Sequence, residues 1–165
     1  MVNRADILVR IDDDHWAQLP GDPDILCQTA ARAALSAAGW DDDNVEISIL
    51  LTSDTDVQVL NRDSRHQDKP TNVLSFATSD DETTVPEGEA LPLGDIVVAF
   101  ETVQREAESA GISLADHTSH MIVHGTLHLL HYDHEIEDEA VEMEALETAI
   151  LAQMGISDPY ARNEI

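Results

Sequence analysis

The spacing of apolar residues along the chain predicts four short strands and five longer helices. Four runs rich in β-branched and aliphatic residues have the length and composition of strands. The predicted strands are residues 6–11, 45–51, 72–76 and 94–99. Elsewhere, apolar residues recur every three or four positions, which is the period of an amphipathic helix. The predicted helices are residues 24–38, 57–66, 101–110, 114–130 and 138–153.

Helix boundaries and loops are indicated by local residue types. Asp22 followed by Pro23 is an N-cap with proline at the first helical position, and Ser113 is suited to cap the histidine-rich helix. Residues 79–92 contain two prolines, one glycine and five acidic residues, which predicts an exposed loop. Residues 156–165 are predicted to form a loosely held tail.

Length and composition favour one domain over residues 1–165. The chain is 42% apolar, which is enough for a core, and strands alternate with helices only at its start. The expected fold is therefore α+β, a small mixed four-stranded sheet packed with about five helices. The single cysteine, Cys27, excludes an internal disulfide and a cysteine-based zinc site. No segment has the length and apolarity of a signal peptide or membrane span, so a cytoplasmic protein without a membrane partner is expected.

The net charge argues at first against a nucleic-acid partner. The chain has 34 acidic and 8 basic residues, for a formal charge of −26, whereas proteins that bind nucleic acids are normally basic. The positions of the charges change this picture. Arg62, Arg65 and Lys69 fall within eight positions, and six of the eight histidines lie between His117 and His134. Both clusters therefore merit attention as candidate chemistry.

The histidine spacing predicts a metal site. His124 and His128 are four residues apart, so they lie on the same face of a helix and can bind one ion together. His134 closes a three-histidine site if the chain turns back near residue 131. Three protein ligands leave a coordination position for water, which is the catalytic arrangement. In a second interpretation, the histidines from His117 onward form one solvated polar face of the helix.

The residue after the first of these histidines bears on the type of hydrolase. Metalloproteases with an H-E-x-x-H motif use that glutamate as the general base. Here the position is Gly125, although the spacing of the three histidines is otherwise that of the metzincin proteases. A metalloprotease therefore remains an alternative that lacks an obvious base.

Several nearby residues have ordinary structural interpretations. Taken alone, Arg65 is best explained by a surface salt bridge. Asp133 is expected to support a neighbouring ligand or the turn, and Ser75 to line a groove without acting as a nucleophile. The acidic residues between 135 and 147 are expected to form a solvated helix face, with Met143 packing toward the core.

Four sequence blocks resemble the YbeY family of bacterial rRNA-maturation endoribonucleases. HGTLHLLHYDH at residues 124–134 is similar to the family signature H-G-x-L-H-L-x-G-Y-D-H. The segment LNRDSRHQDKPTNVLSF at residues 60–76 resembles the family block in which an arginine precedes D-K-P-T-N/D-V-L-S-F. LGDIVV at residues 93–98 and MEALETAI at residues 143–150 match two further blocks, in the same order.

The resemblance implies a specific site and activity. It implies one Zn²⁺ per chain, held by His124, His128 and His134, and Arg65 as the catalytic arginine beside it. It implies cleavage of single-stranded RNA, with roles in 16S rRNA 3′-end maturation and ribosome quality control. The implied partners are rRNA and the ribosome or its proteins, without an organic cofactor. A third hypothesis is a non-catalytic metal-binding protein that acts through ribosomal partners.

The chain departs from the family pattern at three positions. His131 replaces the glycine before Tyr-Asp-His, where the turn is expected to need a positive φ at a cost of about 1 kcal/mol for a non-glycine residue. His131 is also considered as an additional ligand. Ser64 and Ala77 replace a tyrosine and a proline, and both are expected to affect packing more than chemistry.

Overall fold

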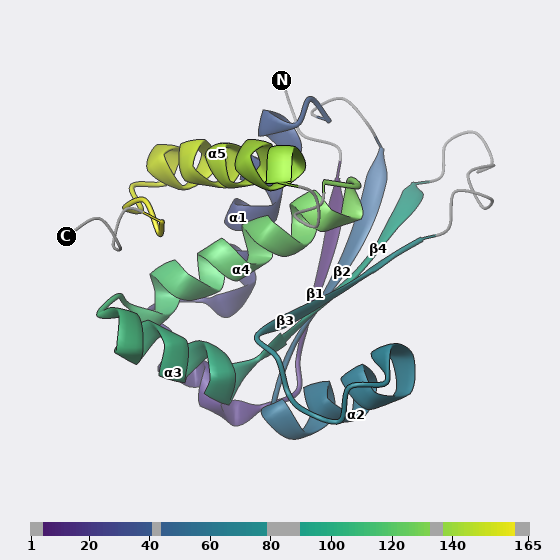
Figure 1. Ribbon diagram of the computed structural model, residues 1–165, viewed down its shortest axis with the longest axis vertical. Helices are drawn as coiled ribbons and strands as arrows, with labels where there is room; N and C mark the ends of the chain where they lie inside the picture. The colour runs from purple at the N-terminus through teal and green to yellow at the C-terminus, as the bar shows by residue number, and fades with distance from the viewer. Residues whose placement is uncertain (1–4, 41–43, 79–89, 133–136, 161–165) are drawn as a thin grey trace.

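The computed structural model describes residues 5–40, 44–78, 90–132 and 137–160. These residues form a four-stranded mixed sheet and helices packed on it, so the predicted α+β fold is confirmed (Figure 1). The strands are β1 (Asp6–Ile11), β2 (Val45–Thr52), β3 (Val73–Ala77) and β4 (Leu91–Ala99). The helices are α1 (Pro23–Ala37), α2 (Asp54–Arg65), α3 (Phe100–Ala110), α4 (Leu114–Leu129), α5 (Glu137–Gln153) and a short 3-10 helix, η1 (Asp14–Gln18), that the sequence analysis did not predict.

The strand order is β1-β2-β4-β3, with β1, β2 and β4 parallel and β3 antiparallel to β4. All four strands were predicted, but β4 begins at Leu91, inside the segment predicted as loop. The physical reason is pairing with β2, because Leu91 lies opposite Val45 and the ladder continues to the end of both strands. The remainder of the predicted loop, residues 79–89, lies outside the described residues.

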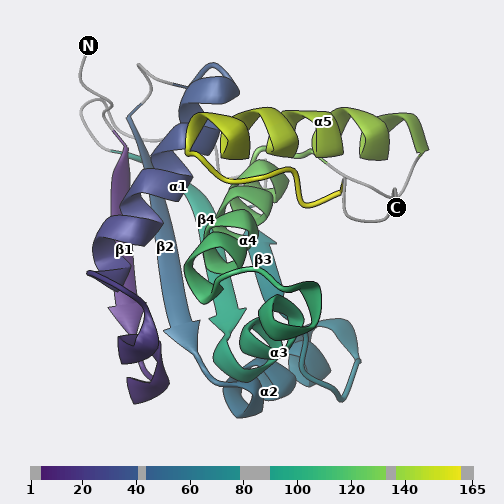
Figure 2. The same cartoon turned by 90° about the vertical axis from the view of Figure 1, so that its left-hand side faces the viewer.

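The two faces of the sheet are covered unequally. Helices α1, α3, α4 and α5 lie on one side of the sheet, and α2 lies across its other side (Figures 1 and 2). Alternate residues of β4 accordingly point to different cores: Ile96 and Val98 belong to the large core, whereas Val97 and Ala99 pack in a small cluster with Val57 of α2. The cleft of the candidate site runs along β3, the strand at the end of the sheet order beside β4.

Helix α4 lies at the centre of the large core. Its N-cap Ser113 accepts a hydrogen bond from the Asp116 amide, as the sequence predicts. Ten of its sixteen residues are buried, including the polar residues Thr118 and His120. A helix buried on most of its surface is held rigidly, which makes α4 a suitable element for positioning chemical groups.

Helix α4 ends in a turn at His131, whose φ is 72°. The His131 amide donates to the His128 carbonyl at 2.9 Å and the Tyr132 amide to the Leu127 carbonyl at 3.0 Å. These two bonds form the Schellman motif that ends helices, in which the residue after the C-cap is left-handed. The predicted positive φ at His131 is therefore confirmed. Asp133 and His134 lie outside the described residues.

The tail is better anchored than the sequence suggests, in the part that the structure describes. Tyr160 donates a hydrogen bond from its hydroxyl to Glu147 at 2.8 Å, and its amide donates to Asp158 at 2.8 Å. Residues 161–165 lie outside the described residues. Within the described parts of the chain, no helix has both the length and the apolar character needed to cross a bilayer.

We predict that any side chain at Gly94 destabilises the fold, because the neighbouring strand leaves no space for a Cβ atom. It has a φ of 142°, and a Cβ at this position would lie 2.2 Å from the Phe76 carbonyl oxygen. Gly39 also has a positive φ, of 87°, but its Cβ would meet open space. We expect Gly94→Ala to lower the free energy of unfolding by about 3 kcal/mol or more, and Gly39→Ala by about 1 kcal/mol, as measured by urea unfolding. Equal effects of the two variants would contradict this interpretation.

Candidate metal centre

A cleft of about 800 Å³ opens between the C-terminal half of α4, strand β3 and the segment that follows α2. The charged and imidazole groups that line it are Arg65, Lys69, His124, His128 and His131. None of the described residues lining the cleft is Asp or Glu, although the chain has 34 acidic residues. The cleft is therefore a locally basic surface on a strongly acidic protein.

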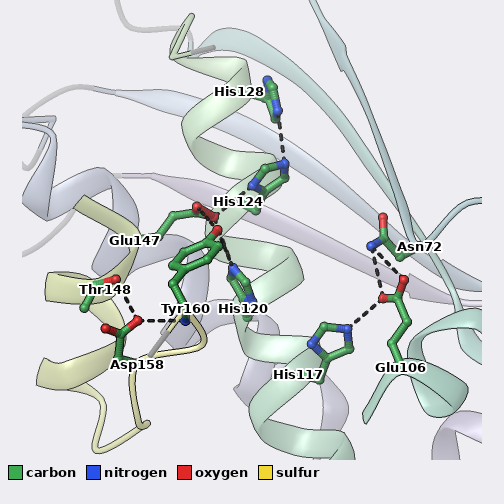
Figure 3. Close-up of polar contacts among 10 residues, drawn as sticks. All are labelled: Asn72, Glu106, His117, His120, His124, His128, Glu147, Thr148, Asp158 and Tyr160. Atoms are coloured by element: carbon green, nitrogen blue, oxygen red, sulfur yellow. Dashed lines mark hydrogen bonds and ion pairs between the residues drawn. The ribbon is translucent and has the colours of Figure 1, made fainter. Parts of the chain in front are cut away.

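The pair His124 and His128 has the geometry of a metal-binding pair. Their Nε2 atoms lie 3.1 Å apart, so both rings point to one place (Figure 3). Two histidines bound to one tetrahedral zinc at about 2.0–2.1 Å hold their nitrogens about 3.3–3.4 Å apart. The observed separation is close to this value, and neutral imidazole is a preferred zinc ligand, so these two residues fit the ion.

The predicted third ligand, His134, lies outside the described residues. Among the residues that are described, no group of three or more His, Cys, Asp or Glu side chains is arranged to hold a metal. The described part of the predicted site is thus the histidine pair. The exposed His131 lines the same cleft from the turn beyond α4.

Glu147 of α5 corrects the prediction for the acidic helix. It was expected on a solvated face, but it is fully buried and receives hydrogen bonds from His124 Nδ1 at 2.8 Å and His120 Nε2 at 3.1 Å. Burial raises the pKa of this carboxyl, but the hydrogen bonds from His120 and His124 outweigh burial and lower its pKa to about 2. A signal was available: Glu147 is four residues after Met143, which was correctly expected to face the core.

The interpretation of the histidines as one solvated face is wrong for the first two. His120 is only 8% exposed, and His117 is paired with Glu106 through its Nε2 at 2.8 Å. Glu106 also accepts a hydrogen bond from the Asn72 side chain at 3.0 Å. The hydrogen bond from His117 is the largest cause that holds the pKa of Glu106 below its ordinary value of 4.5, against the opposing effect of burial. Glu106 of α3 thus connects His117 of α4 with Asn72, the residue before β3.

Arg65 occupies the last turn of α2, which ends at His66 in a left-handed conformation. The Arg65 guanidinium donates to the Ser75 carbonyl at 2.8 Å and lies 5.4 Å from the centre of the Phe76 ring. These contacts to β3 orient Arg65 at the cleft, and no salt bridge of Arg65 is seen among the described residues. The structure therefore brings Arg65 to the same cleft as His124 and His128.

Gly125 lets α4 approach the sheet closely. A Cβ at this position would lie 2.9 Å from Ile96 Cγ2 and 3.2 Å from Ser75 Oγ. The Ser75 hydroxyl, which lines the cleft as predicted, donates to the Gly125 carbonyl at 3.3 Å. A glutamate side chain at residue 125 would collide with the sheet, so the general base of an H-E-x-x-H protease has no room here.

A histidine pair on a buried helix that faces a basic cleft is an arrangement found in metal-dependent hydrolases that act on anionic substrates. A family model described as "Endoribonuclease YbeY" matches residues 20–155. The match covers most of the chain and includes α1 to α5. The chain belongs to the YbeY endoribonuclease family.

Individual relatives agree with this assignment. "Endoribonuclease YbeY" of Paramagnetospirillum magneticum is 52% identical over 161 residues, which cover 97% of this chain and 98% of the relative. The protein of the same name from Azorhizobium caulinodans is 50% identical over 158 residues, which cover 94% of this chain and 96% of the relative. The solution structure of TM1509 from Thermotoga maritima has the same fold, with a TM-score of 0.57 at 20% identity, covering 90% of this chain and 91% of that chain.

The Glu106 network predicts a pH-dependent contribution to stability. Because the folded-state pKa of Glu106 lies below 4.5, its contribution is complete above about pH 4.5 and is lost as the pH falls through the folded-state value. We expect Glu106→Gln to destabilise the protein by about 1 kcal/mol at neutral pH, since solvent screens a half-exposed carboxylate.

Urea unfolding from about pH 7 to pH 3 tests this expectation, because the difference between wild type and Glu106→Gln should shrink with acidification. Glu108→Gln, on an exposed position of α3, is the matched control and should have little effect at any pH. A difference that persists or grows in acid would rule out the proposed contribution of Glu106.

Proposed function

We propose that this chain is a single-strand-specific, zinc-dependent endoribonuclease. The observation that carries the proposal is the convergence of His124 Nε2 and His128 Nε2, 3.1 Å apart, at a basic cleft that also holds Arg65. Membership of the YbeY endoribonuclease family supports the same activity.

The charge distribution supports a polyanionic substrate in spite of the net charge of −26. Arg65 and Lys69 line the cleft, and none of the described residues in the cleft lining is a carboxylate. An RNA strand in this cleft meets cationic groups, whereas the rest of the acidic protein repels it. The acidic surface thereby favours binding of RNA at the cleft over binding at the acidic parts of the protein.

The histidines and Arg65 have separate roles in the proposed reaction. One zinc ion per chain would be held by His124, His128 and His134. When bound, zinc lowers the pKa of a water molecule to near 7 and polarises a phosphoryl oxygen. Arg65 offers a planar set of donors that pairs with two phosphate oxygens, and its contacts with Ser75 and Phe76 limit the orientations it has to search. Arg65 thus aligns the scissile phosphate and offsets the charge that develops on it.

The cellular role follows from the same family assignment. We propose that the substrate is rRNA, in particular the 3′ end of 16S rRNA, and that cleavage serves maturation and ribosome quality control in the cytoplasm. Ribosomal proteins are proposed to bring this acidic enzyme to its substrate. The protease alternative is disfavoured because the sheet leaves no room for a glutamate at residue 125.

The first prediction for this function compares substrates. Purified protein containing about one equivalent of zinc per chain by elemental analysis should cleave single-stranded rRNA and leave casein intact. Cleavage should stop on addition of a chelator and fall steeply with salt, because RNA binding releases counterions. Casein cleavage without RNA cleavage would support the protease instead. Zinc binding without either activity would support the non-catalytic hypothesis.

The second prediction separates metal binding from phosphate alignment. His124→Ala should abolish RNA cleavage and release the zinc. Arg65→Ala should lower RNA cleavage by about 100-fold or more and leave the zinc content unchanged. Arg62→Ala is the matched control, because Arg62 is an exposed arginine on the same helix that pairs with Asp63. Full activity in both His124→Ala and Arg65→Ala would indicate a contaminating nuclease.

A further inference from the structure

Glu147 is the meeting point of groups from three parts of the chain. Its Oε1 receives hydrogen bonds from His124 Nδ1 and His120 Nε2 of α4, and its Oε2 receives one from the Tyr160 hydroxyl in the tail (Figure 3). The Glu147 side chain is only 1% exposed. Two of these partners belong to α4 and the third to the tail, so the carboxylate connects α5 to both α4 and the tail.

A buried carboxylate of this kind is a poor way to stabilise a core. Removing a charge from water carries a large desolvation penalty, and apolar residues of similar volume often stabilise a core as well or better. The three donors satisfy the charge of Glu147, but they do not explain why a charge is there. The direct contact with His124 suggests a role in the metal centre.

The hydrogen bond between Glu147 and His124 selects one tautomer of His124. An ionised carboxylate accepts hydrogen bonds and has none to donate, so His124 carries its proton on Nδ1. The lone pair of the ring then lies on Nε2, the atom that faces His128 at 3.1 Å. This is the tautomer that binds a metal through Nε2, and it is held in a fixed ring orientation before any ion arrives.

Tyr160 of the tail holds the Glu147 carboxylate in place through a hydrogen bond. Asp158 accepts a hydrogen bond from the Tyr160 amide at 2.8 Å and one from the Thr148 hydroxyl of α5 at 3.2 Å. The backbone of Tyr160 is thereby fixed to the same helix that carries Glu147. Its hydroxyl reaches Glu147 Oε2 at 2.8 Å, so both carboxylate oxygens have partners that resist rotation.

We propose that Glu147 is a positioning residue that presets His124 for zinc, and that Tyr160 holds Glu147 in place. The segment from Asp158 to Tyr160 is thus part of the support of the metal centre, although it does not reach the cleft lining. This inference rests on the zinc site of the proposed function. Its mechanism is preorganisation: a ligand already in the right tautomer and orientation loses less freedom when it binds.

Zinc affinity of the full-length protein, measured by competition with a chromophoric chelator, tests the proposal. Glu147→Gln keeps the side-chain volume but removes the charge and one acceptor oxygen, and we expect it to weaken zinc binding about 10- to 100-fold. Tyr160→Phe removes one hydrogen bond to Glu147 and should weaken zinc binding about 2- to 10-fold. The absorption spectrum of the Co²⁺-loaded protein should also change in Glu147→Gln, because it reports ligand geometry.

The matched control is Glu142→Gln, the same chemical change at an exposed position of α5, which should bind zinc as wild type does. Thermal unfolding of the metal-free proteins shows whether each variant folds; if Glu147→Gln does not fold, Tyr160→Phe decides the question alone. Zinc affinity that is unchanged in the folded variants overturns the role of Glu147 while leaving the metal centre intact. Wild-type protein that does not bind zinc overturns the proposed metal centre itself.

Discussion

The close packing of α4 against the sheet determines where the chemistry of this protein can occur. At Gly125 the helix backbone approaches Ile96 and Ser75 so closely that a single added carbon would collide with them. The preceding residue, His124, is consequently held at the edge of the same contact, and His128 lies one turn further along. Because α4 is buried along most of its length, the helix holds the backbone of both histidines at a fixed place relative to the sheet. The tight packing that excludes a protease-type glutamate therefore also makes the histidine pair rigid.

The charged residues of the protein are distributed unevenly between its cleft and the rest of its surface. The protein is strongly acidic, yet the described cleft lining contains only basic and neutral residues. The core, in contrast, contains a negative charge, that of the buried Glu147. This carboxylate contacts Nδ1 of His124, whereas Nε2 of the same ring faces His128. A carboxylate at this place fixes the orientation of the imidazole without repelling an anionic substrate, because the ring separates it from the cleft.

The turn at His131 shows how a departure from the family pattern is tolerated. A glycine adopts positive φ without strain, but the Schellman hydrogen bonds at residues 131 and 132 form here with a histidine. The strain is of the order of 1 kcal/mol, which a well-packed helix can offset. Tyr132, packed against the core directly after the turn, helps to keep the chain in this path.

The sequence by itself determined the features that depend on local geometry. The strands and helices were predictable because side-chain periodicity repeats within each element, and the pairing of His124 with His128 was predictable because residues four apart share a helix face. Positive φ at His131 was predictable because His131 stands at the family's glycine position, where the turn after the helix is made. Only the tertiary structure decided which residues meet across elements. Arg65 contacts β3 and lines the same cleft as the histidines. Glu147 points inward to His124 from a helix whose sequence predicts an acidic, solvated face. Such contacts depend on how the helices and strands pack against one another. A carboxylate can be buried only where the fold supplies hydrogen-bond donors for it.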